Sequence, residues 1–162
     1  MRRWSLVFTC AALVAGTALA QDYPAKPVRV IVGITPGGGL DGGARLTAAK
    51  LSELLKEQFI VENRPGAGGT LAATAVAKSS ADGYTLLFAA STLLISPALY
   101  ENLPFDPVKS FTPISLAGTE LLTISVTPSL AVRNPAELVA LLKANPGKYS
   151  YGSPGVGTVH HL

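Results

Sequence analysis

The 162-residue chain carries 13 basic and 10 acidic residues, so its formal net charge is +3. Two of the basic residues, Arg2 and Arg3, belong to an N-terminal export segment; without them 11 basic and 10 acidic residues remain, a charge of +1. A near-neutral chain without a basic run gives no reason to expect nucleic acid or an anionic membrane as a partner, and its length is sufficient to bury a core.

The first twenty residues have the pattern of a secretory signal peptide. A positive start is followed by an apolar stretch over 6–19, and the small-x-small sequence at 18–20 predicts cleavage after Ala20. The stretch is shorter than the roughly 20 apolar residues of a membrane-spanning helix. Cys10 lies inside the stretch and not after it, which disfavours a lipid anchor. We therefore expect a periplasmic protein that begins at Gln21 and contains no cysteine.

Strand-like and helix-like segments alternate after this point, which predicts an α/β fold with a parallel sheet. The expected first helix places Ala44, Ala48, Leu51 and Leu55 on one face, and Asp41 is expected as its N-cap. The predicted strands cover 28–34, 59–61 and 84–90, and the predicted helices cover 41–57, 70–78 and 91–100.

The sequence of the second half predicts that the chain leaves a first lobe and enters a second one. Residues 111–127 are apolar and β-branched with an interruption at 118–120, so we expect two strands, the first leaving one lobe and the second entering another. The sequence that starts at Asn134 is a strong helix start, with Pro next and Glu three residues on. A short strand is expected at 149–151. The predicted division is a first lobe over 21–118 and the start of a second lobe over 119–162.

Two glycine-rich loops are candidate binding sites, because each follows a predicted strand and opens a predicted helix. The first covers 36–41 and the second covers 153–158. Backbone N–H groups at the positive end of a helix dipole bind phosphate, sulfate or carboxylate without lysine or arginine. Glycine also lets the ligand approach the backbone closely. Two such loops in different lobes predict an anion held between them.

The first loop also matches a dinucleotide fingerprint. Residues 37–42 read G-x-G-x-x-G after a predicted strand, and Glu62 lies 20 residues beyond Gly42. An exported protein meets little nicotinamide cofactor, Asp41 would repel the pyrophosphate, and Gly42 and Gly43 weaken the helix start. A nucleotide-binding oxidoreductase is therefore the alternative and not the leading hypothesis.

Other catalytic and metal signatures are weak. Ser153 lacks the first glycine of a nucleophile elbow. The two histidines, His160 and His161, are adjacent, and neighbours on a helix do not form a chelating pair. We expect at least one of them to be a packed or solvent-facing residue. The sequence thus predicts no catalytic residue, no metal and no cofactor.

Short motifs follow one another through nearly the whole mature chain. The most specific is Glu-Asn-Arg-Pro-Gly-Ala-Gly-Gly at 62–69, and the others lie at 23–32, 36–45, 81–87, 97–100, 103–107 and 155–162. In this order the motifs closely resemble the tripartite tricarboxylate transporter receptors, also called Bug-type solute-binding proteins. The chain departs from the family pattern at 33–35, where the family has an aromatic and prolines, and at Leu40, where it commonly has Thr or Ser.

The resemblance implies a two-lobed, type II-like periplasmic binding protein that is not an enzyme. Such a protein closes around a small carboxylate and delivers it to membrane transporter subunits; the family holds the ligand mainly through the loop after the first strand and the glycine loop of the second lobe, with bridging waters. Carried over to this chain, the ligand-binding residues are Gly37, Gly38, Gly39, Asp41, Ser91, Thr92, Ser153, Gly155, Gly157 and Thr158. His161 matches a family histidine.

Length is the largest departure from the family pattern. Family chains run to about twice this size, so the resemblance implies a nearly complete first lobe and a truncated second lobe. A nonfunctional gene fragment is therefore a further alternative to a working receptor.

Overall fold

The structure is a computed structural model that describes residues 22–119, 121–153 and 155–161. The predicted signal peptide and its cleavage after Ala20 lie outside the described residues. Within the described part of the chain, no helix has the length and apolar character needed to cross a membrane.

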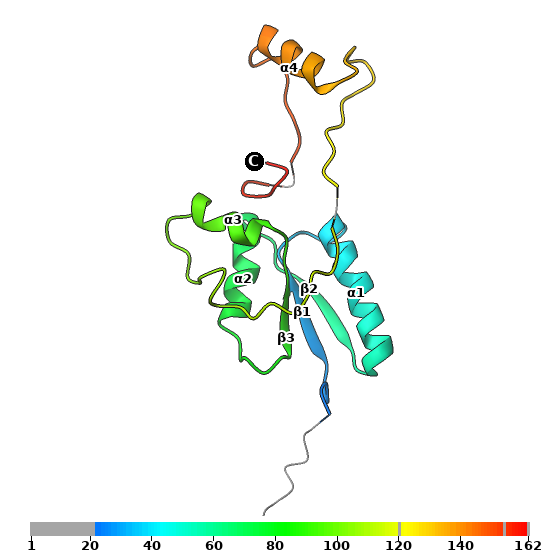
Figure 1. The fold of residues 1–162 in the computed structure, drawn as a ribbon, viewed down its shortest axis with the longest axis vertical. Coiled ribbons are helices and arrows are strands. Elements are labelled where there is room, and N and C mark those ends of the chain that lie inside the picture. Colours follow the sequence, from blue (N-terminus) through cyan, green and yellow to red (C-terminus); the bar gives the residue numbers. More distant parts are fainter. Residues whose placement is uncertain (1–21, 120, 154, 162) are drawn as a thin grey trace, which may run out of the picture.

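A three-stranded parallel sheet with the order β2-β1-β3 forms the centre of the main body (Figure 1). The strands are β1 (Val28–Val32), β2 (Phe59–Asn63) and β3 (Thr85–Phe88), so all three predicted strands of this region are confirmed. Val28 pairs with Phe59, and the register continues along β1 without interruption. The middle strand is the most buried, as expected for a β-branched run covered on both faces.

Helices cover both faces of this sheet (Figure 1). The long helix α1 (Gly39–Leu55) packs on β1 and β2, whereas α2 (Thr70–Ala77) packs on β1 and β3. A short 3-10 turn, η1 (Ala67–Gly69), precedes α2. Helix α3 (Thr92–Leu99) lies against both η1 and α2. The chain moves from β1 to β2 on one side and then back past β1 to β3, so right-handed crossovers place α1 and α2 on opposite faces.

The core lies mainly between α1 and the sheet. Ala44 and Ala48 are buried and Leu51 is partly buried, which confirms most of the predicted helix face, but Leu55 is 41% exposed. The buried cluster consists of Val28, Val30, Ala48 and Phe59, with Leu51, Val61, Tyr84, Leu86 and Phe88 packed against it.

Helix α1 begins two residues before the predicted start. Its N-cap is Gly38, which supplies no side-chain hydrogen bond, and Asp41 stands at the third helical position. The prediction of Asp41 as the N-cap is therefore wrong. The carboxylate instead reaches back, because an acidic side chain at this position can accept from a backbone N–H that precedes the helix; the donor here is Gly37 N, at 2.9 Å.

Gly42 weakens the first turns of α1 without a packing reason. A Cβ placed on Gly42 would meet no atom within 4 Å. We expect Gly42→Ala to stabilise the chain by up to about 1 kcal/mol, because glycine loses more backbone entropy in a helix than alanine does. The measurement is the urea midpoint at constant m-value. Gly37→Ala is the contrasting variant: it also meets open space, but its φ of +91° should make alanine destabilising. An unchanged or lower midpoint for Gly42→Ala would contradict the prediction.

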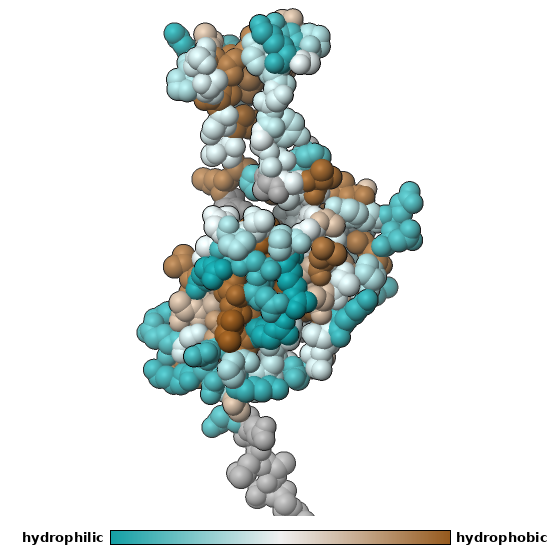
Figure 2. Space-filling model, turned by 180° about the vertical axis from the view of Figure 1, so that it is seen from behind, coloured by the Kyte–Doolittle hydropathy of each residue, from teal (hydrophilic) through white to brown (hydrophobic). Residues whose placement is uncertain are grey.

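The predicted helix start at Asn134 is confirmed in detail. Helix α4 (Pro135–Ala144) is N-capped by Asn134, whose Oδ1 accepts from Glu137 N at 3.0 Å. The Glu137 carboxylate in turn accepts from Arg133 N at 2.8 Å, which completes a capping box. The helix lies apart from the main body, with apolar side chains at the surface (Figure 2); Val139 and Leu142 are 49% and 43% exposed.

The strands predicted within 111–127 and at 149–151 are wrong for the described residues. Residues 111–119, 121–127 and 149–151 form no strand, and Leu121 is 95% exposed. A β-branched sequence favours an extended backbone, but a strand requires a neighbour to accept its hydrogen bonds. No described strand lies beside these segments. The division into lobes at residue 118 stays a prediction.

Candidate ligand-binding site

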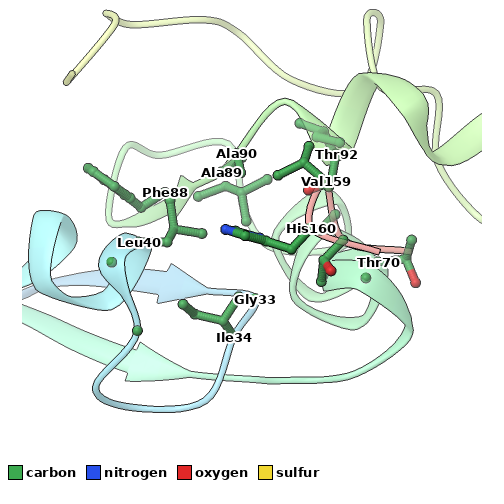
Figure 3. Close-up of a pocket in the computed structure, with 18 residues that line it drawn as sticks. Gly33, Ile34, Leu40, Thr70, Phe88, Ala89, Ala90, Thr92, Val159 and His160 are labelled. Atoms are coloured by element: carbon green, nitrogen blue, oxygen red, sulfur yellow. The ribbon is translucent and has the colours of Figure 1, made fainter. Parts of the chain in front are cut away.

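A cavity of about 320 Å³ opens at the carboxyl edge of the sheet, beyond β1 and β3 (Figure 3). At β1 the connections diverge, with α1 leaving to one face and α2 covering the other, and a crevice at such a switch point is where open α/β sheets bind ligands. The lining comes from the β1–α1 loop, the η1–α2 junction, the β3–α3 junction and a loop far along the chain: Gly33, Ile34, Gly38, Gly39, Leu40, Gly68, Gly69, Thr70, Ala73, Leu87, Phe88, Ala89, Ala90, Thr92, Leu93, Thr158, Val159 and His160.

The structure brings four of the predicted ligand-binding residues into this cavity. Gly38 and Gly39 enter from the first glycine loop, Thr92 from the start of α3, and Thr158 from the second glycine loop. Ser91 lines an adjoining groove of about 600 Å³ that shares part of the same wall. Segments from both predicted loops therefore meet at one place.

The other five predicted residues lie outside the lining of both hollows. They are Gly37, Asp41, Ser153, Gly155 and Gly157. Their direct contact with a ligand stays a prediction, but two of them, Asp41 and Gly157, have clear structural partners.

Asp41 is a buried carboxylate at the centre of a hydrogen-bond network. Its side chain is 4% exposed; Oδ2 accepts from Gly37 N at 2.9 Å and from Arg45 Nε at 3.0 Å, and Oδ1 accepts from Asn63 Nδ2 at 2.8 Å. The amide of Asn63 also donates to Ile34 O at 3.1 Å. The network joins the end of β2 to the loop after β1, and thereby fixes the backbone that presents Gly38 and Gly39 to the cavity.

These partners lower the pKa of Asp41 from 3.8 to about 2, chiefly through the Arg45 hydrogen bond, then those of Gly37 and Asn63. The folded-state pKa is below the unfolded one, so the ionised carboxylate stabilises the fold above pH 4 and this contribution disappears as the pH falls through about 2. We expect the stability difference between wild type and Asp41→Asn to be constant above about pH 5 and to shrink on acidification. Urea unfolding across this range measures it.

The control for this prediction is Glu53→Gln, which removes an exposed carboxylate on the same helix that pairs with Lys50. Glu62 also has a lowered pKa, mainly because Arg29 donates to it. Wild type therefore loses stability in acid for more than one reason, and the difference between wild type and Asp41→Asn is the informative quantity. A difference that is the same at pH 2.5 and pH 6 would contradict the assignment.

Glycine contacts connect the sheet to the second glycine loop. A Cβ on Gly33 would lie 2.6 Å from Gly69 Cα, so the end of β1 touches the start of α2 through backbone atoms. A Cβ on Gly68 would lie 2.7 Å from Gly157 O. Gly157 is buried, has a φ of +82° and also lies against the Tyr100 hydroxyl. This backbone contact holds residues 158–160 at the cavity.

His160 is a lining residue to which sequence reasoning gave no role. Figure 3 shows its ring reaching into the cavity between Leu40, Ala89 and Gly33. His161 points elsewhere, with its ring 6.5 Å from the ring of Tyr151. Two adjacent histidines offer no local signal that separates the one in the cavity from the one outside it.

The cavity carries little charge. Among the described residues that line it there is no Lys, Arg, Asp or Glu. Across the part of the chain that the structure describes, no group of three or more His, Cys, Asp or Glu side chains is arranged to hold a metal ion. Polar contacts for a ligand come from threonine hydroxyls, His160 and the first N–H groups of α1, which have no acceptor within the helix.

The dinucleotide fingerprint is not assembled as a nucleotide site in this arrangement. Glu62, its expected ribose partner, accepts from Arg29 Nη2 at 2.7 Å and pairs with Arg64 at 2.6 Å. Gly37 and Gly42 line neither hollow.

Comparison with protein families matches residues 44–162 to the family described as "Tripartite tricarboxylate transporter family receptor". A UPF0065 protein of Bordetella pertussis is 40% identical over 153 residues, which is 93% of this chain and 46% of that protein. BugT of the same organism is 35% identical over 158 residues, covering 96% and 48% of the two chains. The chain thus spans about half the length of the curated relatives it matches.

Solved structures agree with this match. The periplasmic binding protein BugD has a TM-score of 0.71 at 31% identity, covering 86% of this chain and 46% of its own. A Rhodopseudomonas palustris protein solved with adipate has a TM-score of 0.70 at 33% identity, with 85% and 46% covered. MatC from Rhodopseudomonas palustris, solved with malate, has a TM-score of 0.52 at 38% identity, with 59% and 33% covered. The predicted α/β fold of a periplasmic binding protein is confirmed.

Proposed function

Because the chain belongs to the tripartite tricarboxylate transporter receptor family, we propose that it captures a small carboxylate in the periplasm for a membrane transporter. The observation that carries the proposal is the switch-point cavity, which contains the start of α1 and, among its described lining residues, no acidic side chain to repel an anion. The family is one of substrate-binding receptors.

The start of α1 supplies the attraction for a carboxylate. Gly39 and Leu40 are the first two residues of a 17-residue helix, and both line the cavity. Their N–H groups lie at the positive end of the helix dipole. A hydrogen bond from such a donor to a charged acceptor is worth roughly 1.5–3 kcal/mol. Two such donors would favour a carboxylate over a neutral group at this end of the helix.

The second glycine loop supplies the opposing wall. Residues 158–160 lie against the main body although more than fifty residues separate them from α3 (Figure 3). A ligand that touches both walls stabilises the arrangement in which they are close. In this proposal Gly38, Gly39, Thr92 and Thr158 contact the ligand or its bridging waters, while Asp41 and Gly157 position them.

We also propose export to the periplasm with cleavage after Ala20. The sequence pattern of the first twenty residues supports this proposal. The relatives solved with adipate and malate hold carboxylates, which supports the same ligand class for this chain. The transporter subunits are the proposed partners, by analogy with the family description.

The test is calorimetry with mono-, di- and tricarboxylates, each beside its amide. A carboxylate should bind at least tenfold more tightly than its amide, or about 1.4 kcal/mol. Gly38→Val should weaken binding by a similar factor, because a side chain at this lining position blocks close approach to the backbone, and its Cβ, 2.7 Å from Ile34 Cδ1, would displace the Ile34 side chain, which also lines the cavity. Gly42→Val is the control, since position 42 faces open space on the same helix. Equal binding of acid and amide, or normal binding by a folded Gly38→Val variant, would overturn the proposal.

A further inference from the structure

We infer that Asn63 is a positioning residue for carboxylate binding, whose amide holds the loop between β1 and α1 in the conformation that presents the first N–H groups of α1. Asn63 lines neither hollow, so we place its action in this loop and not in contact with the ligand. The inference rests on the proposed function, because it concerns the same carboxylate site. The contacts that support it lie within residues 32–64, away from the second glycine loop.

The sheet fixes the backbone from which the Asn63 side chain extends. Asn63 is the last residue of β2 and pairs with Val32 at the end of β1. The next residue, Arg64, donates its backbone N–H to Val32 O at 2.8 Å, so the contact between the strands continues past Asn63. A side chain on a rigid strand holds its partners more precisely than one on a loop.

The amide nitrogen of Asn63 joins the two ends of the loop after β1. Nδ2 donates to Ile34 O at 3.1 Å, close to the end of β1, and to Asp41 Oδ1 at 2.8 Å, in the first turn of α1. Gly38 and Gly39, which line the cavity, lie between these two contacts. A single side chain therefore restrains the segment 35–40 from both sides.

The hydrogen-bond pattern at position 63 requires an amide. Nδ2 faces two acceptors, whereas Oδ1 accepts from Arg45 Nη2 at 3.0 Å, so both hydrogens of the amide and its oxygen are used. A carboxylate here would place an oxygen against the carboxylate of Asp41 and the carbonyl of Ile34. A leucine would leave the buried Asp41 with one donor fewer.

The loop needs such a restraint because of its composition. Residues 37–39 are three consecutive glycines, and glycine has more backbone conformations available than any other residue. N–H groups at a helix start bind an anion only when they point at it, and a loop fixed in advance loses less conformational entropy on binding. Release of the loop from Asn63 should therefore lower the affinity for a carboxylate while the sheet stays folded.

The first experiment is calorimetry at pH 7 with adipate and malate, each beside its diamide. Asn63→Leu, which keeps a similar volume, should weaken binding of the acids about tenfold. Asn63→Asp should weaken it at least as much, because it also sets two carboxylates against each other. Asn102→Leu is the matched control. It changes an exposed asparagine outside both hollows and should bind like wild type.

An exchange of the two side chains separates the hydrogen bond from the charge. The double variant Asp41→Asn/Asn63→Asp has the net charge of wild type and allows an amide at position 41 to donate to a carboxylate at position 63. It should bind the acids at least about threefold more tightly than Asn63→Asp does. Recovery should be partial, because the bond to Ile34 O stays lost.

Amide hydrogen exchange locates the effect without a ligand. The backbone N–H of Gly37 donates to Asp41, and that of Gly42 donates to Gly38 O at 2.9 Å. Both amides should exchange about tenfold faster in Asn63→Leu, while the amides within β1 keep the protection that they have in wild type.

Failure of this inference and failure of the proposed function give different results. If a folded Asn63→Leu variant binds the acids as wild type does, or if exchange accelerates equally in β1 and in the loop, the inference is wrong while a carboxylate receptor remains. If wild type binds neither acid better than its diamide, the proposed function is wrong, and exchange at Gly37 and Gly42 still decides whether Asn63 positions the loop.

Discussion

Gly33→Val is expected to destabilise the fold by about 3 kcal/mol, the upper end of the usual cost of overpacking. The Cβ alone would lie 2.6 Å from Gly69 Cα and 3.2 Å from Gly69 O, and both are backbone atoms that no rotamer change can move. The end of β1 and the start of α2 would have to separate. This loss is a large part of the 5–15 kcal/mol that stabilises a typical domain.

Urea unfolding followed by circular dichroism measures the effect of Gly33→Val. The control is Gly42→Val, in which the new Cβ meets no atom within 4 Å. A midpoint for Gly33→Val within experimental error of that control would show that β1 and α2 are not in backbone contact.

Gly157→Val is expected to lower carboxylate affinity at least tenfold while leaving the sheet intact. Position 157 has a φ of +82°, which a β-branched residue rarely adopts. Its Cβ would also lie 2.7 Å from the Tyr100 hydroxyl and 3.4 Å from Gly68 Cα. The loop should leave its contact with Gly68 and withdraw residues 158–160 from the cavity.

Two measurements check the Gly157→Val prediction. Amide hydrogen exchange over 155–161 should accelerate, and calorimetry with the carboxylate that binds wild type best should show the weaker affinity. Gly147→Val is the matched control, because its φ of +73° imposes a similar backbone strain in open space. Equal affinity for the two variants would mean that the loop does not form part of the binding site.

The sequence predicted those elements whose signal is local. The β-branched run of β1, the apolar spacing of α1 and the capping residues around Asn134 are each contained in a few neighbouring positions. The first and third are confirmed, and so is the α1 face except for the exposed Leu55. The strands expected within 111–127 are wrong because a strand depends on a partner elsewhere in the chain. Asp41 was predicted as the N-cap but is the third helical residue, and its distant hydrogen-bond donor Asn63 cannot be seen in a local pattern.

Only part of the candidate site could be predicted, because only part of it has a local sequence signal. Both glycine loops were identified, and Gly38, Gly39, Thr92 and Thr158 do line one cavity. The apolar wall around Phe88 and the entry of His160 arise from packing between segments far apart in the sequence, which periodicity does not encode. The motif at 62–69 was recognised as specific to the family, and the structure shows what some of its residues do. Asn63 donates to Asp41, and the glycines at 68 and 69 allow close backbone contacts with Gly157 and Gly33.

The contact between Gly68 and Gly157 separates the position of the second glycine loop from the chemistry of the side chains that the loop presents. The second glycine loop is seated by main-chain atoms, so its docking requires glycine at those two positions and little from the side chains that follow. Residues 158–160 line the cavity that we propose as the solute site. Substitutions at 158–160 would therefore change the wall of this cavity while the main-chain seat of the loop stays the same.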